Sequence, residues 1–134
     1  MCGTAAAIEF LASLGEGATR REQLLTAYAT LHSQTEELFR QLWDGLVRNP
    51  LVTVFGLPPG EHRAPTVSFI VKGFTAKQIS ERLAERGVFV SHGNFYALTV
   101  ARRLGQEADG LVRVGLSCYS TAEEVARLLE ALPQ

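Results

Sequence analysis

Cysteine is scarce in this chain, and long apolar runs are absent. The two cysteines, Cys2 and Cys118, belong to no Cys-x-x-Cys pair and have no histidine at metal-ligand spacing. The sequence therefore predicts neither a disulfide framework nor a metal site, and two scattered thiols favour a reducing, cytoplasmic compartment. No apolar stretch approaches the roughly 18 residues that a membrane helix needs, so no membrane association is expected.

An excess of charge is lacking as well. The formal net charge is -1, which argues against nucleic-acid binding because that function usually requires a basic face. Hydrophobic residues, by contrast, make up 46% of the 134 residues. That share suits one globular domain with a core and argues against disorder.

Two helices are predicted at the start of the chain. The stretch 3–15 has apolar residues at helical spacing and ends at a glycine, which indicates a short helix. Thr19 and Glu22 then form a capping box, and helical periodicity continues until an Asn-Pro pair ends it. The resulting helix over about 20–48 is long for a chain of this size. Such a helix usually spans a domain face or reaches toward another domain.

Strands and single helices alternate in the rest of the chain. The predicted strands are 51–56, 66–71, 88–90 and 111–117. The predicted helices are 75–86, 97–104 and 121–132, and the first and last of these open with capping boxes. This order favours an α+β sandwich, in which helices cover a small mixed or antiparallel sheet of about four strands. We expect a linker helix at 1–17 and a small domain at 18–134.

Arg113 interrupts the aliphatic residues of the last predicted strand. Read with a period of two, one face of that strand carries Val112, Val114 and Leu116. The other face carries Arg113 beside Gly115, which leaves room next to the guanidinium for a planar carboxylate held by two parallel hydrogen bonds. The alternative is an arginine on a solvated sheet face, paired with a nearby glutamate.

The loop predicted at 91–96 concentrates polar and aromatic side chains around a glycine. Such loops often form the rim of a ligand site, so His92, Asn94 and Tyr96 join Arg113 as candidate substrate-binding residues. The alternative is an ordinary loop whose aromatic residues pack on the core. No catalytic residue is predicted. Cys118 has no adjacent base or cation and is interpreted as a small, partly buried residue.

Three segments of the chain together resemble one family. The segment that begins with Arg113 is RVGLSCYSTAEEVARLLEAL, and it resembles the C-terminal part of class V aminotransferases. These are fold-type I enzymes that use pyridoxal 5'-phosphate (PLP), and they include the cysteine desulfurases. A cysteine desulfurase-like branch looks most similar to GVFVSHGNFYALTVARRLG. The helix that connects the family's large and small domains is similar to the opening GTAAAIEFLASLGEG.

This resemblance implies a function for Arg113, which would bind the α-carboxylate of an amino-acid substrate. It also implies a homodimer whose active site lies between this small domain and a PLP-binding large domain. PLP is therefore expected in a full-length parent enzyme and not on this chain, which looks like a fragment that is not catalytic alone. Neither Lys72 nor Lys77 sits in a motif like that of the family's Schiff-base lysine.

The loop departs from the pattern of cysteine desulfurases. Tyr96 falls where those enzymes present the cysteine that takes up sulfur, and Ser91 falls where an arginine often lies. The resemblance therefore leaves desulfurase, aminotransferase, epimerase and lyase activities open. The alternative hypothesis is not an enzyme domain: the chain would be a free-standing α+β module that contacts a partner protein or a second copy of itself through its long helix.

Overall fold

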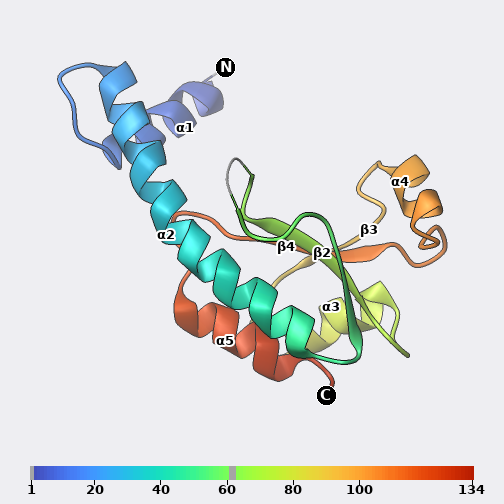
Figure 1. Ribbon diagram of the computed structural model, residues 1–134. Coiled ribbons are helices and arrows are strands. Elements are labelled where there is room, and N and C mark those ends of the chain that lie inside the picture. The colour runs from blue at the N-terminus through green and yellow to red at the C-terminus, as the bar shows by residue number, and fades with distance from the viewer. Residues whose placement is uncertain (1, 61–62) are drawn as a thin grey trace. The chain divides into compact units, whose positions relative to one another are not determined.

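The computed structural model describes residues 2–60 and 63–134, and these contain five helices and four strands (Figure 1). The chain divides into two units, Met1–Glu37 and Leu38–Gln134, and the boundary lies inside a helix. None of the helices in the described ranges is both long and apolar enough to cross a membrane.

The first unit contains helix α1 (Cys2–Ser13) and the start of helix α2 (Arg20–Arg48). The predicted capping box is present, because the Thr19 N–H donates to the Glu22 carboxylate at 3.0 Å and the Glu22 N–H donates to the Thr19 hydroxyl at 3.3 Å. It satisfies two of the free N–H groups that every helix start exposes. The long predicted helix is thereby confirmed, with its end at residue 48.

The second unit is built on an antiparallel sheet with the strand order β1-β2-β4-β3. Its strands are β1 (Val52–Phe55), β2 (Thr66–Val71), β3 (Ser91–Gly93) and β4 (Leu111–Gly115). Burial alternates along β2, so one face of the sheet packs on the core and the other does not. The predicted α+β fold with a four-stranded sheet is confirmed.

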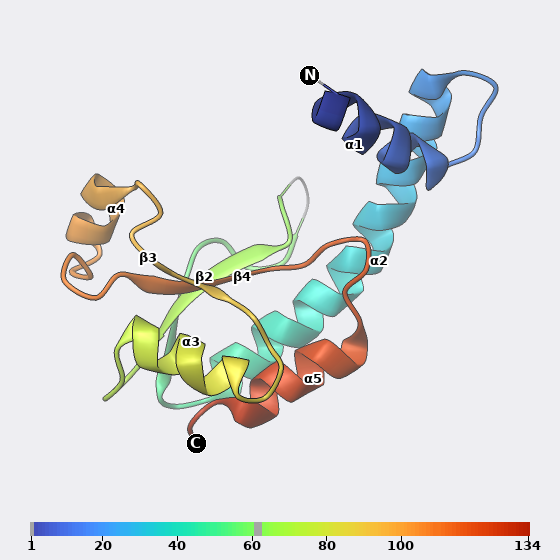
Figure 2. The ribbon, with the colours of Figure 1, turned by 180° about the vertical axis from the view of Figure 1, so that it is seen from behind.

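Helices α3 (Ala76–Ala84) and α5 (Ala122–Ala131) lie on the same side of this sheet, as Figure 2 shows. They pack there with the part of α2 that belongs to this unit. The side chains that fill the space are almost completely buried, and the largest are Phe69, Leu42, Leu46, Ile79 and Leu83. Capping boxes open both α3 and α5, as the sequence predicts.

Two strand predictions are wrong in position. The segment 88–90 is not a strand, because Val88 and Val90 pack against the core and the pairing with β4 begins only at Ser91. The predicted loop 91–96 therefore starts with a strand. At the other end, β4 stops at Gly115 because the Ser117 N–H turns back to the Ser120 hydroxyl at 3.0 Å.

Candidate functional site

Arg113 occupies the centre of β4, which has a neighbouring strand on each side. Its direct cross-strand partners are Ser68 in β2 and Ser91 in β3. Directly opposed residues of antiparallel strands share a face, so two short hydroxyl side chains flank the arginine. Arg113 is exposed, whereas Val112 and Val114 are buried on the opposite face. The pairing of β4 with both neighbouring strands thus fixes the backbone position of Arg113 and the face from which its side chain projects.

Phe95 lies directly under the guanidinium. The Arg113 Cζ atom is 4.0 Å from the centroid of the Phe95 ring. A cation over an aromatic face gains about 0.5–1 kcal/mol at an exposed site. Within residues 2–60 and 63–134, no carboxylate forms an ion pair with Arg113. The guanidinium is therefore held by a ring, which leaves its N–H donors available to a ligand.

A tight turn after β3 presents that ring. The Asn94 side-chain oxygen accepts the N–H of Tyr96 at 3.1 Å, and the Asn94 carbonyl accepts the N–H of Ala97 at 2.8 Å. Between these bonds Phe95 and Tyr96 adopt φ values of 53° and 59°. This left-handed region is rarely populated by bulky residues, so the asparagine's hydrogen bonds stabilise an otherwise costly conformation.

The four candidate residues do not all meet. Asn94 and Tyr96 lie in the turn that carries the ring under Arg113, and the Tyr96 side chain is fully exposed. His92 pairs with Val112, so it projects from the face opposite Arg113. Sequence reasoning missed Phe95 as a site residue. Its role depends on the strand register and on the left-handed turn, and neither has a local sequence signal.

Gly93, at the end of β3, and Gly110, just before β4, lie in close backbone contact. Gly110 has a φ of 71°, and a Cβ atom built there would overlap the backbone of Gly93. Only glycine therefore fits at position 110 without a shift of its neighbour. The contact fastens the end of β3, where the turn of Phe95 begins, to the start of β4.

The lysines of the chain do not fit the covalent attachment of PLP. Lys77 is an exposed helix residue whose ammonium lies 3.6 Å from the Glu81 carboxylate, in an i,i+4 pair on α3. Lys72 is exposed immediately after β2. A Schiff-base lysine works in a desolvated pocket, and neither side chain has one. The described residues also contain no cluster of three side chains suited to hold a metal ion.

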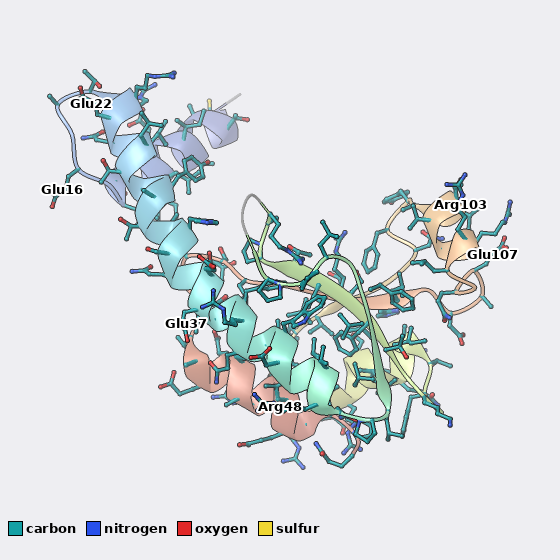
Figure 3. All side chains as sticks on the ribbon, in the orientation of Figure 1. Glu16, Glu22, Glu37, Arg48, Arg103 and Glu107 are labelled. Atoms are coloured by element: carbon teal, nitrogen blue, oxygen red, sulfur yellow. The ribbon has the colours of Figure 1, made fainter. Side chains whose placement is uncertain are left out.

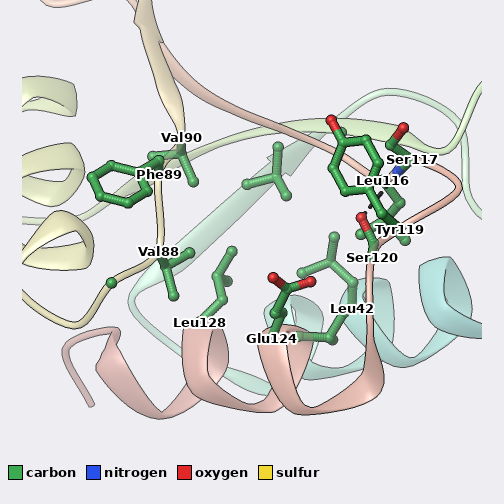
Figure 4. Close-up of a pocket in the computed structure, with 14 residues that line it drawn as sticks. Leu42, Val88, Phe89, Val90, Leu116, Ser117, Tyr119, Ser120, Glu124 and Leu128 are labelled. Carbon is green, nitrogen blue, oxygen red and sulfur yellow. Dashed lines mark hydrogen bonds between the residues drawn. The ribbon is translucent and has the colours of Figure 1, made fainter.

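A cavity of about 320 Å³ lies on the helix-covered side of the sheet (Figure 4). Its walls are mainly aliphatic, and its polar side chains are Ser117, Tyr119, Ser120 and Glu124. The Glu124 carboxylate already accepts the N–H of Thr121 at 3.0 Å as part of a capping box. Arg113 does not line this cavity, so the arginine surface is a different place on the molecule. Cys118 is partly buried, as predicted.

Comparison with known proteins now decides the family. Residues 2–128 match the family model described as Aminotransferase class-V. The chain belongs to the class-V aminotransferase family. The resemblance that the sequence indicates is thereby confirmed.

Relatives within the class-V aminotransferases are longer than this chain. An uncharacterized protein of Mycobacterium tuberculosis is 36% identical over 98% of this chain and 33% of its own length. A probable cysteine desulfurase of Pseudomonas putida is 31% identical over 98% of this chain and 28% of its own length. The chain thus spans a third or less of these curated relatives.

Solved structures agree on the fold. The apo cysteine desulfurase from Thermococcus onnurineus NA1 superposes with a TM-score of 0.72 and 27% identity, covering 83% of this chain and 27% of that one. The cysteine desulfurase CsdA of Escherichia coli superposes with a TM-score of 0.64 at 21% identity, over 87% of this chain and 30% of that one. The second likeness supports the fold alone.

Proposed function

We propose that this chain is the C-terminal substrate-binding part of a PLP-dependent class-V enzyme, in which Arg113 binds the α-carboxylate of an amino-acid substrate. One observation carries the proposal. The guanidinium stands on the exposed face of the sheet, over the Phe95 ring, without a carboxylate partner among the described residues. An arginine that lacks an internal anion but is held in place is suited to bind an external one.

The surroundings of Arg113 suit a small, planar anion. Ser68 and Ser91 flank it with hydroxyl groups that can donate further hydrogen bonds, and Gly115 leaves space on the same face. In this proposal Asn94 and Tyr96 form the rim of the carboxylate-binding site around Arg113. His92, the fourth predicted substrate-binding residue, projects from the opposite face of the sheet and therefore has no part in carboxylate binding in this proposal.

PLP belongs to the rest of the parent enzyme in this proposal. It supplies the electron sink for chemistry at the α-carbon of an amino acid. The chain's own part is to bind and orient the carboxylate, because its lysines do not fit the attachment of PLP. The greater length of the relatives supports a large domain in the parent enzyme. That the parent acts as a homodimer is part of the proposal and rests on the family resemblance. The family resemblance implies that Tyr96 falls where desulfurases present their reactive cysteine, so we propose an amino-acid substrate without specifying the reaction.

Purification of the native protein tests the parent enzyme. Antibodies raised against this chain are expected to isolate a polypeptide three to four times as long, from which denaturation releases PLP. A native protein of 134 residues that retains no PLP and copurifies with no PLP-binding protein would contradict the proposal.

Arg113→Ala in that enzyme tests the role of the arginine. Loss of a bidentate contact to a desolvated carboxylate costs on the order of 2–5 kcal/mol, so kcat/KM for amino acids is expected to fall steeply with a rise in KM. Arg103→Ala is the matched control, because Arg103 is an exposed arginine of α4 (Leu98–Arg103), labelled in Figure 3. Equal values of kcat/KM for Arg113→Ala and the control would show that Arg113 is a solvated surface residue without a role in substrate binding.

A second candidate function rests on the first unit of the chain. This unit exposes several large apolar side chains, which are Ile8, Phe10, Leu14, Leu25 and Tyr28. Such side chains are typical of a surface that another protein covers, so a free-standing assembly module is the alternative. Light scattering on the purified chain separates the two. A stable homodimer favours the module if the native protein is also no longer than this chain.

A further inference from the structure

The position of Phe95 has a consequence for the arginine above it. The Arg113 Cζ atom lies over the Phe95 ring, 4.0 Å from its centroid, and the Asn94 turn holds the Phe95 backbone in the left-handed region. An arginine side chain that is free in solution samples many rotamers and loses about 0.5–1.5 kcal/mol of entropy when a ligand immobilises it. A side chain already held against a ring loses less of that freedom on binding.

We infer that Phe95 is a positioning residue, which holds the Arg113 guanidinium so that its open edge receives a monocarboxylate. The inference rests on the proposed function of Arg113. Phe95 acts through the arginine, because one ring face is occupied by the guanidinium and the ring carries no hydrogen-bonding group for the ligand. The Arg113 guanidinium forms no hydrogen bond or ion pair with the described residues, so the N–H donors that a carboxylate needs are unused.

The Asn94 turn fixes the position of the Phe95 ring relative to Arg113. Asn94 bonds to the backbone of Tyr96 and Ala97, so the ring of Phe95 is placed by two hydrogen bonds on its own turn and by the strand that precedes it. Ser91, two residues before Gly93, pairs directly with Arg113. The same short segment therefore positions both a cross-strand neighbour and the stacking partner of the arginine.

Nuclear magnetic resonance on the 134-residue chain tests the inference with propionate as the ligand and propionamide as its uncharged match. In the wild-type chain, the ring current of Phe95 should shift the side-chain Nε–H signal of Arg113, and propionate should perturb that signal further. Phe95→Leu is expected to remove the ring-current shift and to weaken propionate binding about two- to tenfold, the range that ordering one side chain contributes. Phe95→Tyr keeps a ring and should restore both.

Two controls keep the result specific. Phe89→Leu makes the same replacement at an aromatic side chain that is 85% exposed and stacks on no cation among the described residues, so it should change neither signal nor affinity. Asn94→Ala keeps the ring but removes the hydrogen bond of the turn, so it should weaken binding in the same direction as Phe95→Leu. The backbone amide spectrum of each variant shows whether the fold is retained.

The outcomes separate this inference from the proposed function. Binding to Arg113→Lys is followed by the backbone amide signals of Ser68 and Ser91, the cross-strand partners of position 113. If Arg113→Lys removes the response of these amides to propionate while Phe95→Leu keeps wild-type affinity, the positioning role of Phe95 is refuted and the role of Arg113 stands. If propionate binds Arg113→Lys as well as it binds the wild type, the proposed function fails. An unshifted Arg113 signal in the wild-type chain would show that the stack does not form in solution, and that result also overturns the inference.

Discussion

Ser91 and His92 are adjacent in β3, yet only Ser91 faces Arg113. Ser91 pairs with Arg113 and His92 pairs with Val112, so their side chains project from opposite faces of the sheet. The face of the sheet that carries Arg113 therefore includes Ser91, which was not predicted from the sequence as a substrate-binding residue. It excludes His92, which was predicted as one.

A glutamate at position 91 should compete with a bound ligand. Ser91→Glu places a carboxylate directly across from Arg113, and an opposite-charge cross-strand pair contributes roughly 0.2–1 kcal/mol. We expect the affinity for propionate to fall about two- to fivefold, measured by titration of the Arg113 side-chain signal. His92→Glu adds the same charge on the opposite face and should leave the affinity near that of the wild type. Equal losses for the two variants would contradict the observed register.

Truncation of Phe69 should strongly destabilise the second unit. This β2 side chain is completely buried, and replacing a buried phenylalanine with alanine costs about 3–5 kcal/mol through lost burial and a residual cavity. Urea denaturation followed by circular dichroism measures the free energy of unfolding. Phe89→Ala is the control, since an exposed side chain outside the core should change it by no more than about 0.5 kcal/mol.

Loss of the α5 cap should cost less and act locally. The Thr121 hydroxyl accepts the N–H of Glu124 at 3.2 Å, and the Glu124 carboxylate accepts the N–H of Thr121 at 3.0 Å. Thr121→Ala is expected to lower the free energy of unfolding by about 1 kcal/mol. Thr99→Ala, at an exposed position of α4, should change it by a few tenths of that amount. A Thr121 variant as stable as the Thr99 variant would mean that the cap is not formed.

Acid should loosen the segment that follows α4. Two hydrogen bonds, at 2.9 and 2.7 Å, join the Arg102 guanidinium to the Glu107 carboxylate, and Figure 3 shows Glu107 close to that helix. This contact lowers the pKa of Glu107 from its ordinary value. The folded form therefore binds the proton less readily than the unfolded one. The contribution of the pair is complete above the ordinary pKa and disappears as the pH falls through the lowered one.

Hydrogen exchange at the α4 amides checks this pH dependence. Glu107→Gln should speed their exchange at neutral pH and remove the additional loosening in acid. Glu130→Gln, which makes the same change on the exposed surface of α5, should leave α4 unaffected. Wild-type α4 amides that show no acid-linked loosening beyond that of Glu107→Gln would contradict the role of the pair.

Local signals in the sequence were enough for the helices and for β2. Capping boxes at Thr75 and Thr121 fix their helix starts by side-chain hydrogen bonds that span only three residues. The alternation within 66–71 likewise reports burial on one face directly. These features are decided by neighbours along the chain, and so a reader of the sequence can find them.

The position of β3 and the partner of Arg113 were not decided locally. The segment 88–93 is apolar first and polar later, and the apolar half packs on the core while the polar half pairs with β4. The register of an edge strand is set by its partner, which no local pattern reveals. Phe95 reaches Arg113 only through that register and through two successive left-handed residues, a conformation that an aromatic sequence argues against.

The close contact between Gly110 and Gly93 affects how natural sequence variants at position 110 should be interpreted. Gly110 touches no ligand in the proposed site and lies in a surface connection, where substitutions are ordinarily tolerated. Any side chain there would nevertheless overlap the Gly93 backbone and force a shift at the end of β3, two residues before Phe95. If Arg113 binds a carboxylate as proposed, a natural variant at position 110 is expected to change the affinity without changing any residue that contacts the ligand.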